Sequence, residues 1–227
     1  MVLIFVYLQP HPITPGGTSS RSSSTLLLTK ERGRGVAEGR GVRVRLHMEN
    51  KRMMPPLKKA LFLDRDGVIN EDVAYPYKPE HIVFIPGVFD LCKTALAKGY
   101  IIVVVTNQAG IAKGYFTEDD VQRLHEWMKK QFADKGIVIS GFYYCPFHKN
   151  GVVERYRGDS DCRKPKPGLI LKAAEELGVD ISKSLMVGDK LSDRIELPQL
   201  RSIVIKSKYI SEGYDIENLK DVEGYLL

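Results

Sequence analysis

The sequence predicts an α/β fold in which one parallel sheet carries helices on both faces, the doubly wound or Rossmann-like arrangement. Short apolar runs rich in β-branched residues alternate along the chain with segments whose apolar residues recur at helical spacing. Several of these runs end in polar residues, as expected where parallel strands point at one ligand-binding edge. Hydrophobic residues make up 43% of the 227, which is sufficient for a sizeable core.

The expected elements alternate in chain order. The segment 58–64 is a short apolar run ending in an acid, and 100–107 is rich in β-branched residues, as buried strands are. The segment 86–99 has helical spacing and stops at a glycine, while 117–136 opens on Thr117, a residue type that caps helix N-termini. The other expected elements are a strand at 137–145, a helix at 167–178, and strands at 184–189 and 201–207.

The first quarter of the chain differs in composition from the rest. An early apolar run is followed by stretches rich in Pro, Gly and Ser and then in Arg and Gly, without a sustained helical or strand period. We interpret 1–57 as a disordered or non-native leader and expect 58–227 to form the domain. Residues 1–59 contain 11 Lys or Arg and 3 acids, a net charge of +8, whereas the remainder contains 23 and 25, a net charge of −2.

This charge distribution bears on the partners. Because the basic residues belong to the leader, the domain has no electrostatic footprint for nucleic acid. No stretch approaches the roughly 20 apolar residues that span a bilayer, so no membrane is expected either. The sequence therefore favours a small-molecule substrate. We also expect a monomer.

The chain has three cysteines, Cys92, Cys145 and Cys162. An odd, sparse set does not predict a disulfide framework, so we expect a reducing, cytoplasmic compartment. His125 lies on the helix predicted at 117–136 and is assigned to packing or to solvent rather than to a site.

The first candidate motif is Asp64-Arg65-Asp66-Gly67, directly after a predicted strand. Residues two apart in an extended segment point the same way, so two carboxylates can face one site. A carboxylate can attack phosphorus, and a second can protonate the leaving group and then activate water. Carboxylate oxygens also suit Mg²⁺. Alone, the motif could equally be a strand end capped by a polar turn.

Three further motifs lie at strand ends or before a helix. Thr106 and Asn107 end a predicted strand, where a hydroxyl and backbone N–H groups can hold phosphate oxygens. Arg163 and Lys164 precede two prolines and a helix, which constrain where the basic side chains point. Asp189 ends another strand and could complete a Mg²⁺ shell. Each could instead be an ordinary loop, and only their conjunction in this order points to phosphoryl transfer.

Together the strings LFLDRDGVIN, VTNQAGIAKGYFT, CRKPKPG and MVGDKLSD resemble the haloacid dehalogenase superfamily of phosphohydrolases. The similarity covers about residues 58–205 and is greatest to the branch of heptose bisphosphate and histidinol-phosphate phosphatases. The resemblance implies a Mg²⁺-dependent phosphomonoesterase that acts through an aspartyl-phosphate. Its implied substrate is a small sugar phosphate, D-glycero-D-manno-heptose 1,7-bisphosphate, cleaved at position 7.

The same resemblance implies roles for individual residues. Asp64 would be the nucleophile, Asp66 the general acid and base, and Lys164 the stabilising lysine. The implied substrate contacts are Thr106, Asn107, Arg163 and Lys190. The implied Mg²⁺ ligands are Asp64, the backbone carbonyl of Asp66, and Asp189, with Asp193 in support.

The intervals that carry a cap domain in many relatives are short here, so no large cap is expected, and 145–162 is the main candidate covering loop. In the heptose bisphosphate branch this loop usually binds Zn²⁺ through Cys-x-His and Cys-x-Cys pairs. This chain departs from that pattern. Cys145, His148 and Cys162 remain as candidate zinc ligands, with Asp159 or Asp161 as a fourth, against the alternative of a degraded site.

Three other functions stay open from the sequence. Histidinol-phosphate phosphatases share these motifs. Polynucleotide 3′-phosphatases carry a similar TNQ-x-GI stretch, although no kinase motif accompanies it here. The scaffold could also serve as a non-catalytic binding protein, but Asp64, Lys164 and Asp189 are all retained.

Overall fold

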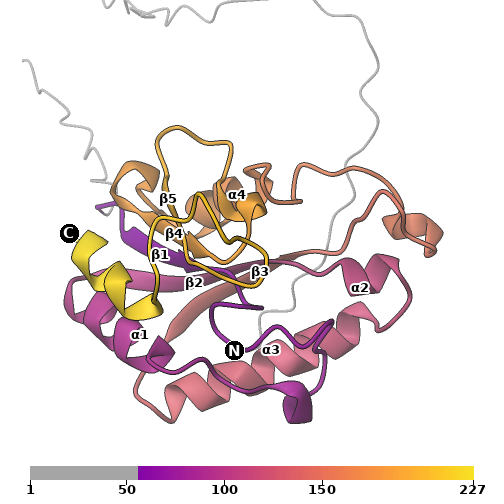
Figure 1. The fold of residues 1–227 in the computed structure, drawn as a ribbon, viewed down its shortest axis with the longest axis horizontal. Coiled ribbons are helices and arrows are strands. Elements are labelled where there is room, and N and C mark those ends of the chain that lie inside the picture. The colour runs from indigo at the N-terminus through magenta and orange to yellow at the C-terminus, as the bar shows by residue number, and fades with distance from the viewer. Residues whose placement is uncertain (1–55) are drawn as a thin grey trace, which may run out of the picture. The chain divides into compact units, whose positions relative to one another are not determined.

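Five parallel strands form the central sheet of the computed structural model, which describes residues 56–227. The expected leader therefore lies, up to residue 55, outside the described residues. The strands are β1 (Lys59–Leu63), β2 (Tyr100–Asn107), β3 (Ile139–Cys145), β4 (Leu185–Gly188) and β5 (Arg201–Val204). Their order across the sheet is β3-β2-β1-β4-β5 (Figure 1).

The strand order places β1 at the centre, paired in parallel with β2 on one side and β4 on the other. The chain builds outward from β1 to β3 and then returns to place β4 and β5 on the opposite side. In such sheets ligands bind beyond the carboxyl ends of the strands where the order reverses. The residues that follow β1, β2 and β4 therefore meet at one edge.

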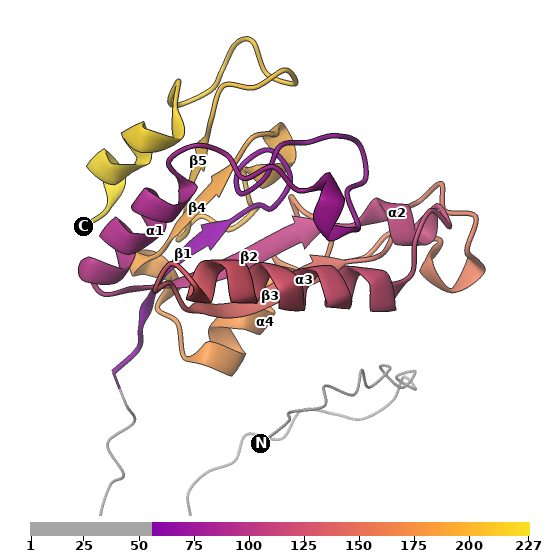
Figure 2. The ribbon, with the colours of Figure 1, turned by 90° about the horizontal axis from the view of Figure 1, so that it is seen from below.

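Helices cover both faces of the sheet, as the sequence predicts (Figure 2). The α-helices are α1 (Val88–Ala97), α2 (Ala109–Ala112), α3 (Glu118–Ala133) and α4 (Gly168–Leu177). Short 3₁₀-helices lie at Pro79–His81, Glu154–Tyr156, Ile181–Lys183, Leu191–Asp193 and Leu219–Tyr225.

The alternation of side chains along β1 divides the core into two layers. Leu61 and Leu63 pack with α1, α3 and the C-terminal 3₁₀-helix on one face. Ala60 and Phe62 pack with α4 on the other. This two-residue period, with both faces buried, is typical of a parallel strand.

The helix ends agree with the capping signals in the sequence. Thr117 accepts a hydrogen bond from the Asp120 N–H, and the Asp120 carboxylate accepts one from the Thr117 N–H, which together form a capping box at the start of α3. Gly178 ends α4 in the left-handed conformation. The predicted long helices and strands are therefore confirmed, and α2 with the 3₁₀-helices is added to them.

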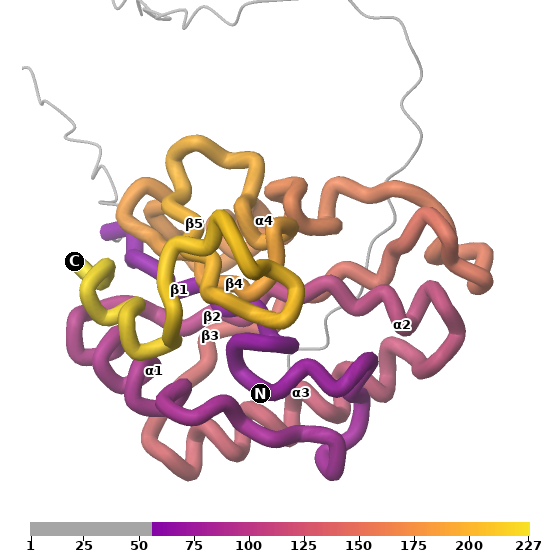
Figure 3. Tube along the Cα trace, viewed as in Figure 1, coloured from indigo at the N-terminus to yellow at the C-terminus, as the bar shows by residue number. Residues whose placement is uncertain are grey.

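The segment after β5 returns to the sheet edge at which the carboxyl ends of β1, β2 and β4 meet. In Figure 3 the yellow chain that follows β5 passes beside the indigo loop that follows β1. Asp72 joins the two, because its carboxylate accepts a hydrogen bond from the Tyr209 hydroxyl at 2.9 Å and its carbonyl accepts one from the Lys208 ammonium at 2.7 Å. Between residues 56 and 227, no helix is long and apolar enough to cross a membrane.

Candidate active site

Three buried carboxylates meet where β1 and β4 end. Asp64 follows β1, Asp189 follows β4, and Asp193 closes the next 3₁₀-helix. Their ligand oxygens lie within 4.8 Å of one another, and this is the one His, Cys, Asp or Glu cluster with such spacing found in the described part of the chain. The pairing of β1 with β4 brings together residues that are 125 or more positions apart in the sequence.

Lys164 supplies the opposing charge. Its ammonium lies 2.9 Å from Asp64 Oδ1 and 2.5 Å from Asp193 Oδ1, and it donates to the Val105 carbonyl at 3.0 Å. Two carboxylate oxygens and one carbonyl oxygen therefore surround the ammonium. The side chain is buried, so the two carboxylates hold it in a place where an unpaired ammonium would be costly.

Glycines at two strand ends allow this close approach. Gly67 adopts φ of +98°, and a Cβ there would overlap the Asp189 carboxylate. A Cβ on Gly188 would overlap Asp193, whose Oδ2 accepts hydrogen bonds from the N–H groups of Asp189 and Lys190 at 3.2 and 3.0 Å. Asp193 therefore supports the loop as well as pairing with the lysine.

Burial dominates the electrostatics of the cluster. It raises the pKa of Asp64 despite the opposing effect of Lys164, and it raises the pKa of Asp189 to about 7. Burial alone would lower the pKa of Lys164, but the carboxylates of Asp193 and Asp64 outweigh it and raise that pKa. Three converging carboxylates with one buried ammonium retain an excess of acid, and their oxygens are the donors that Mg²⁺ prefers. The residues thus fit a divalent cation.

A second lysine, the partly exposed Lys190, also contacts the acidic cluster. Its ammonium lies 3.2 Å from Asp189 Oδ1, 2.9 Å from Asp72 Oδ2 and 3.4 Å from the Asp66 carbonyl oxygen. The ammonium also stands 4.6 Å from the centre of the Tyr209 ring. Lys190 thereby links the acidic cluster to the segment that follows β5.

The Asp66 carboxylate accepts hydrogen bonds from three side chains. The Arg65 guanidinium donates to both oxygens of Asp66 at 3.0 Å. Asn70 donates to Oδ1 and Gln108 to Oδ2, each also at 3.0 Å. Both carboxylate oxygens are therefore fixed before any ligand binds.

Arg65 is fully buried, and its partners were not predicted from the sequence. It donates to the Pro76 carbonyl at 2.8 Å, to Gln108 Oε1 at 3.2 Å, and to His125 Nε2 at 3.2 Å. Burial, with the adjacent positive charge of Arg65, lowers the pKa of His125 well below its usual range, so the imidazole is a neutral acceptor. The assignment of His125 to packing or solvent misses this contact, because the sequence does not indicate that α3 passes under the loop after β1.

Thr106 and Asn107 lie at the end of β2, beside the loop that follows β1. Thr106 is buried, and its hydroxyl accepts a hydrogen bond from Gln108 Nε2 at 3.0 Å. Asn107 donates to the Lys164 carbonyl at 3.1 Å and accepts from the Lys164 N–H at 3.0 Å. The amide of Asn107 thus fixes the backbone of the lysine, a contact that the sequence does not indicate.

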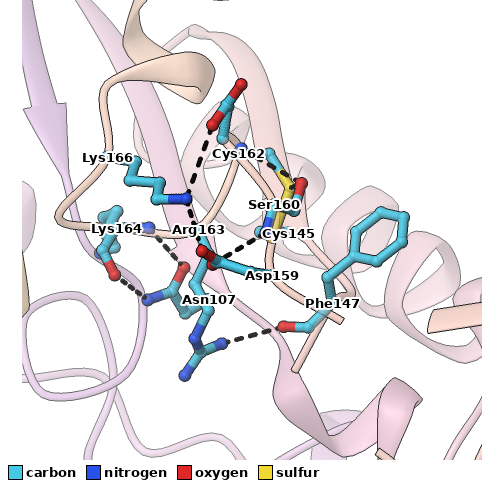
Figure 4. Close-up of a disulfide and its surroundings, with 10 residues drawn as sticks. Asn107, Cys145, Phe147, Asp159, Ser160, Cys162, Arg163, Lys164 and Lys166 are labelled. Carbon is cyan, nitrogen blue, oxygen red and sulfur yellow. Dashed lines mark hydrogen bonds and ion pairs between the residues drawn. A yellow bond between two sulfur atoms is a disulfide. The ribbon is translucent and has the colours of Figure 1, made fainter. Parts of the chain in front are cut away.

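The covering loop is closed by a disulfide between Cys145, at the end of β3, and Cys162, immediately before Arg163 (Figure 4). The expectation that the cysteines form no disulfide is therefore wrong. Sulfurs bonded to each other are not thiolate ligands, so of the two alternatives for Cys145, His148 and Cys162 the disulfide favours a degraded zinc site. His148 Nδ1 instead accepts the Asn150 N–H at 3.1 Å.

The acids considered as a fourth zinc ligand have another partner. Asp159 lies 2.7 Å and Asp161 3.6 Å from the Lys166 ammonium. Arg163 donates from Nη1 to the Phe147 carbonyl at 3.2 Å (Figure 4). The loop thus has its own hydrogen bonds and ion pairs next to Lys164.

Comparisons with known proteins bear on this geometry. A family model described as HAD-hydrolase-like matches residues 161–196. The heptose-1,7-bisphosphate 7-phosphatase of Vibrio cholerae is 41% identical over 180 residues, which cover 75% of this chain and 97% of that protein. The enzyme of Burkholderia mallei is 52% identical over 135 residues, 60% of this chain and 71% of that protein. The chain belongs to the heptose-bisphosphate 7-phosphatase family of HAD hydrolases.

Solved structures agree with this membership. A D,D-heptose 1,7-bisphosphate phosphatase from B. bronchiseptica, complexed with magnesium and phosphate, superposes with a TM-score of 0.62 at 27% identity, over 74% of this chain and 97% of that one. A HAD-like phosphatase from Mesorhizobium loti gives 0.65 at 33% identity, over 77% and 88%. As a family member, the chain is a phosphoric monoester hydrolase.

Proposed function

We propose that this protein removes the phosphate at position 7 of D-glycero-D-manno-heptose 1,7-bisphosphate in a Mg²⁺-dependent reaction through an aspartyl-phosphate on Asp64. The observation that carries the proposal is the convergence of Asp64, Asp189 and Asp193 around Lys164 at the sheet edge. The relatives named for this activity supply the substrate.

The orientation of Asp64 supports its role as nucleophile. Its Oδ1 accepts the Arg65 N–H at 2.7 Å and pairs with the Lys164 ammonium at 2.9 Å. Both contacts fall on one oxygen, so the carboxylate cannot rotate freely. Attack of the carboxylate on phosphorus forms a phosphorus–oxygen bond to Asp64 as the bond to the sugar oxygen breaks.

Asp66 is the proposed general acid and base. Protonated, it gives its proton to the departing sugar oxygen, and as the carboxylate it takes a proton from the water that attacks the aspartyl-phosphate. The second step releases inorganic phosphate and regenerates Asp64. The Arg65 and Gln108 donors hold Asp66 for both proton transfers.

Asp64, Asp189 and the Asp66 carbonyl would hold Mg²⁺. When bound, the ion would offset negative charge on the transferred phosphoryl group and on the carboxylates. Lys164 adds a fixed positive charge at the same place, and its own acceptors keep it from moving. Thr106 and Arg163 are proposed contacts of the substrate phosphates.

A substrate panel with Mg²⁺ tests the proposal. Wild-type protein should hydrolyse the heptose 1,7-bisphosphate with a kcat/KM at least about tenfold above that for histidinol phosphate or a 3′-phosphorylated oligonucleotide. Asp64→Asn should abolish turnover, and chelation of the metal should do the same. Equal or faster hydrolysis of histidinol phosphate would reject the substrate, and turnover that survives Asp64→Asn would reject the mechanism.

We also propose that the enzyme acts as a monomer in the cytoplasm. Light scattering should give the mass of one chain, 25.6 kDa. A mass of two chains at micromolar concentration would contradict the monomer. Fractionation of cells that produce the protein tests the compartment, and recovery outside the cytoplasmic fraction would contradict it.

A further inference from the structure

Asp72, on the loop after β1, receives hydrogen bonds from two distant segments. Its Oδ2 accepts one from the Lys190 ammonium and one from the Tyr209 hydroxyl, each at 2.9 Å. Its carbonyl oxygen accepts another from the Lys208 ammonium at 2.7 Å. The second carboxylate oxygen, Oδ1, accepts the Ala74 N–H at 3.2 Å, so the carboxylate has a fixed orientation toward Lys190.

Asp72 and Lys190 form an ion pair that is partly shielded from water. The Asp72 side chain is 12% exposed and that of Lys190 is 31% exposed. Burial alone would raise the pKa of Asp72, but the hydrogen bonds and charge of Lys190 and the hydrogen bond of Tyr209 outweigh it and lower that pKa. Asp72 is therefore a carboxylate, and its attraction for Lys190 is screened less than that of a fully exposed pair.

The Tyr209 ring contacts the same ammonium, which lies 4.6 Å from the ring centre, within the range of cation–π attraction. A turn fixes the ring. The Tyr209 N–H donates to Ser207 Oγ at 3.1 Å, and that hydroxyl donates to the Asp189 carbonyl at 2.6 Å. The turn ends at the buried Ile210, whose N–H donates to the Ser207 carbonyl at 3.1 Å. Tyr209 is thereby attached to the backbone of the acidic cluster.

The Lys190 ammonium also contacts that cluster. It lies 3.2 Å from Asp189 Oδ1 and 3.4 Å from the Asp66 carbonyl oxygen. Both atoms are among the oxygens proposed to hold Mg²⁺. An ammonium and a divalent cation at the same oxygens would compete for their lone pairs and repel each other. The position of Lys190 should therefore affect how tightly the ion is bound.

The contacts of Lys190 oppose one another. The contact with Asp72, at 2.9 Å, is shorter than either contact with the proposed Mg²⁺ ligands. Among residues 56–227, the carboxylates within ion-pair distance of Lys190 are those of Asp72 and Asp189. If Asp72 and the Tyr209 ring did not attract the ammonium, Asp189 would be its remaining acidic partner.

We propose that Asp72 and Tyr209 are positioning residues that attract the Lys190 ammonium away from the Mg²⁺ ligands and thereby increase the affinity of the site for the ion. Both act through Lys190 rather than through contact with the ion. The inference rests on the proposed function in one respect, the assignment of Asp189 and the Asp66 carbonyl as metal ligands.

Metal binding by the full chain without substrate tests the inference. Mn²⁺ is the probe, because it takes the same kinds of oxygen ligand as Mg²⁺, and electron paramagnetic resonance measures its unbound fraction with Mg²⁺ as competitor. Asp72→Asn should weaken binding of both ions about 5- to 30-fold, the effect of losing a charge-assisted contact. Tyr209→Leu should weaken it about two- to fivefold, as expected for an exposed cation–π contact, whereas Tyr209→Phe retains the ring and should stay within about twofold of wild type.

The Lys190→Met background separates positioning from a simple loss of negative charge. A long-range effect of the Asp72 charge would lower the affinity by the same factor whether or not Lys190 is present. An effect that passes through Lys190 should make the loss in Asp72→Asn at least about threefold smaller in that background, an ordinary coupling for residues in contact. Tyr209→Leu, which changes no charge, should there alter the affinity by less than about 1.5-fold.

Activity provides a second measurement. The Mg²⁺ concentration that gives half-maximal activity should rise by the same factors in Asp72→Asn and Tyr209→Leu. At saturating Mg²⁺ their kcat should stay within about twofold of wild type, because the ion then displaces the ammonium. A residue with only a structural role would not move the metal requirement while sparing kcat.

The same segment of the chain offers a matched control. Tyr214 donates its hydroxyl to Glu217, and its ring centre lies 5.2 Å from the Lys206 ammonium, which in turn pairs with Glu217 at 3.0 Å. The three residue types and contacts are those of the Lys190 group, but the lysine here is exposed and pairs with Glu217 rather than with the acidic cluster. Tyr214→Leu and Glu217→Gln should leave the Mn²⁺ affinity within about twofold of wild type.

Several outcomes would overturn the inference. Unchanged metal affinity in Asp72→Asn would do so, as would equal losses from Asp72→Asn with and without Lys190. A loss in Tyr209→Leu that persists in the Lys190→Met background would also overturn it, as would losses of the same size in the Tyr214 and Glu217 controls.

Failure of the proposed function is recognised separately, because binding is measured without substrate. Wild-type protein that binds Mn²⁺ but does not hydrolyse the heptose bisphosphate would reject that substrate, and the binding data would still decide the inference. Mn²⁺ binding that is unchanged in Asp189→Asn would place the ion elsewhere and would overturn the inference itself.

Discussion

Replacing Lys164 by methionine should weaken both the fold and the chemistry, by different amounts. The change removes the cation between Asp64 and Asp193 while retaining most of the side-chain volume. Two buried carboxylates would then face each other without a counterion. Removing one partner of a buried ion pair costs about 3–5 kcal/mol, against a total stability of about 5–15 kcal/mol for a domain.

The loss of activity should follow from the same contacts. A preorganised donor aimed at the developing charge is worth about 10²–10³ in kcat. Lys164→Met should therefore lower kcat by at least that factor on every phosphomonoester. Adding Asp193→Asn should recover part of the stability, because it removes one carboxylate and retains an acceptor for the Asp189 N–H. It should recover none of the activity.

Stability can be followed by urea unfolding in the presence of a chelator. Trp127, the single tryptophan of the chain, stacks on Phe84, both partly buried against the core, and it reports the transition. Activity is measured with Mg²⁺ on the heptose bisphosphate. The reasoning is refuted if the free energy of unfolding of Lys164→Met lies within about 0.5 kcal/mol of the wild-type value. It is also refuted if adding Asp193→Asn leaves the stability of Lys164→Met unchanged.

Other contacts give further expectations. His125 stays neutral in the folded state, whereas it gains a proton below about pH 6.5 when unfolded, so its contribution to stability is present above that pH and is lost as the pH falls. Urea titrations should show that, relative to His125→Gln, the wild-type protein loses up to about 1.4 kcal/mol of stability per pH unit between pH 6.5 and 5. Parallel curves of stability against pH for the two proteins would contradict this. Gln108→Ala should lower kcat about 10- to 100-fold with little change in KM, since it removes one of the two donors to Oδ2 of Asp66, the proposed general acid, and a change confined to KM would argue against positioning. In the unfolded protein, a thiol reagent should detect one thiol before reduction, that of Cys92, and three after reduction. Cys162→Ser should lower the stability by about 3 kcal/mol under oxidising conditions only. Three thiols before reduction would exclude the disulfide.

Much of the fold could be predicted because its signals are local. The run at 100–107 is β-branched and forms β2, and Thr117 with Asp120 caps α3 as the residue types suggest. The convergence of Asp64, Asp189 and Lys164 could also be predicted, since parallel strands end at one edge. These inferences need only the alternation of elements and the residues at their ends.

The missed features depend on where distant segments cross. Arg65 and His125 are 60 positions apart, and their contact depends on how α3 packs under the loop after β1. Cys145 and Cys162 are 17 positions apart, and only the course of the loop brings their Cα atoms to 5.4 Å. Spacing alone left both a zinc ligand set and a degraded site open, because both use the same residue types.

The strand order has a consequence for how binding and folding are coupled. One acidic residue follows β1, the first strand in the chain, and the other two follow β4, the fourth strand. These residues come together only when β1 pairs with β4, where the strand order of the sheet reverses. A fragment ending at β3 would carry Asp64 without its acidic companions and should bind a divalent cation weakly. A cation bound at this site would contact residues from the early and the late halves of the chain. Because it binds only the folded state, it would raise the free energy of unfolding.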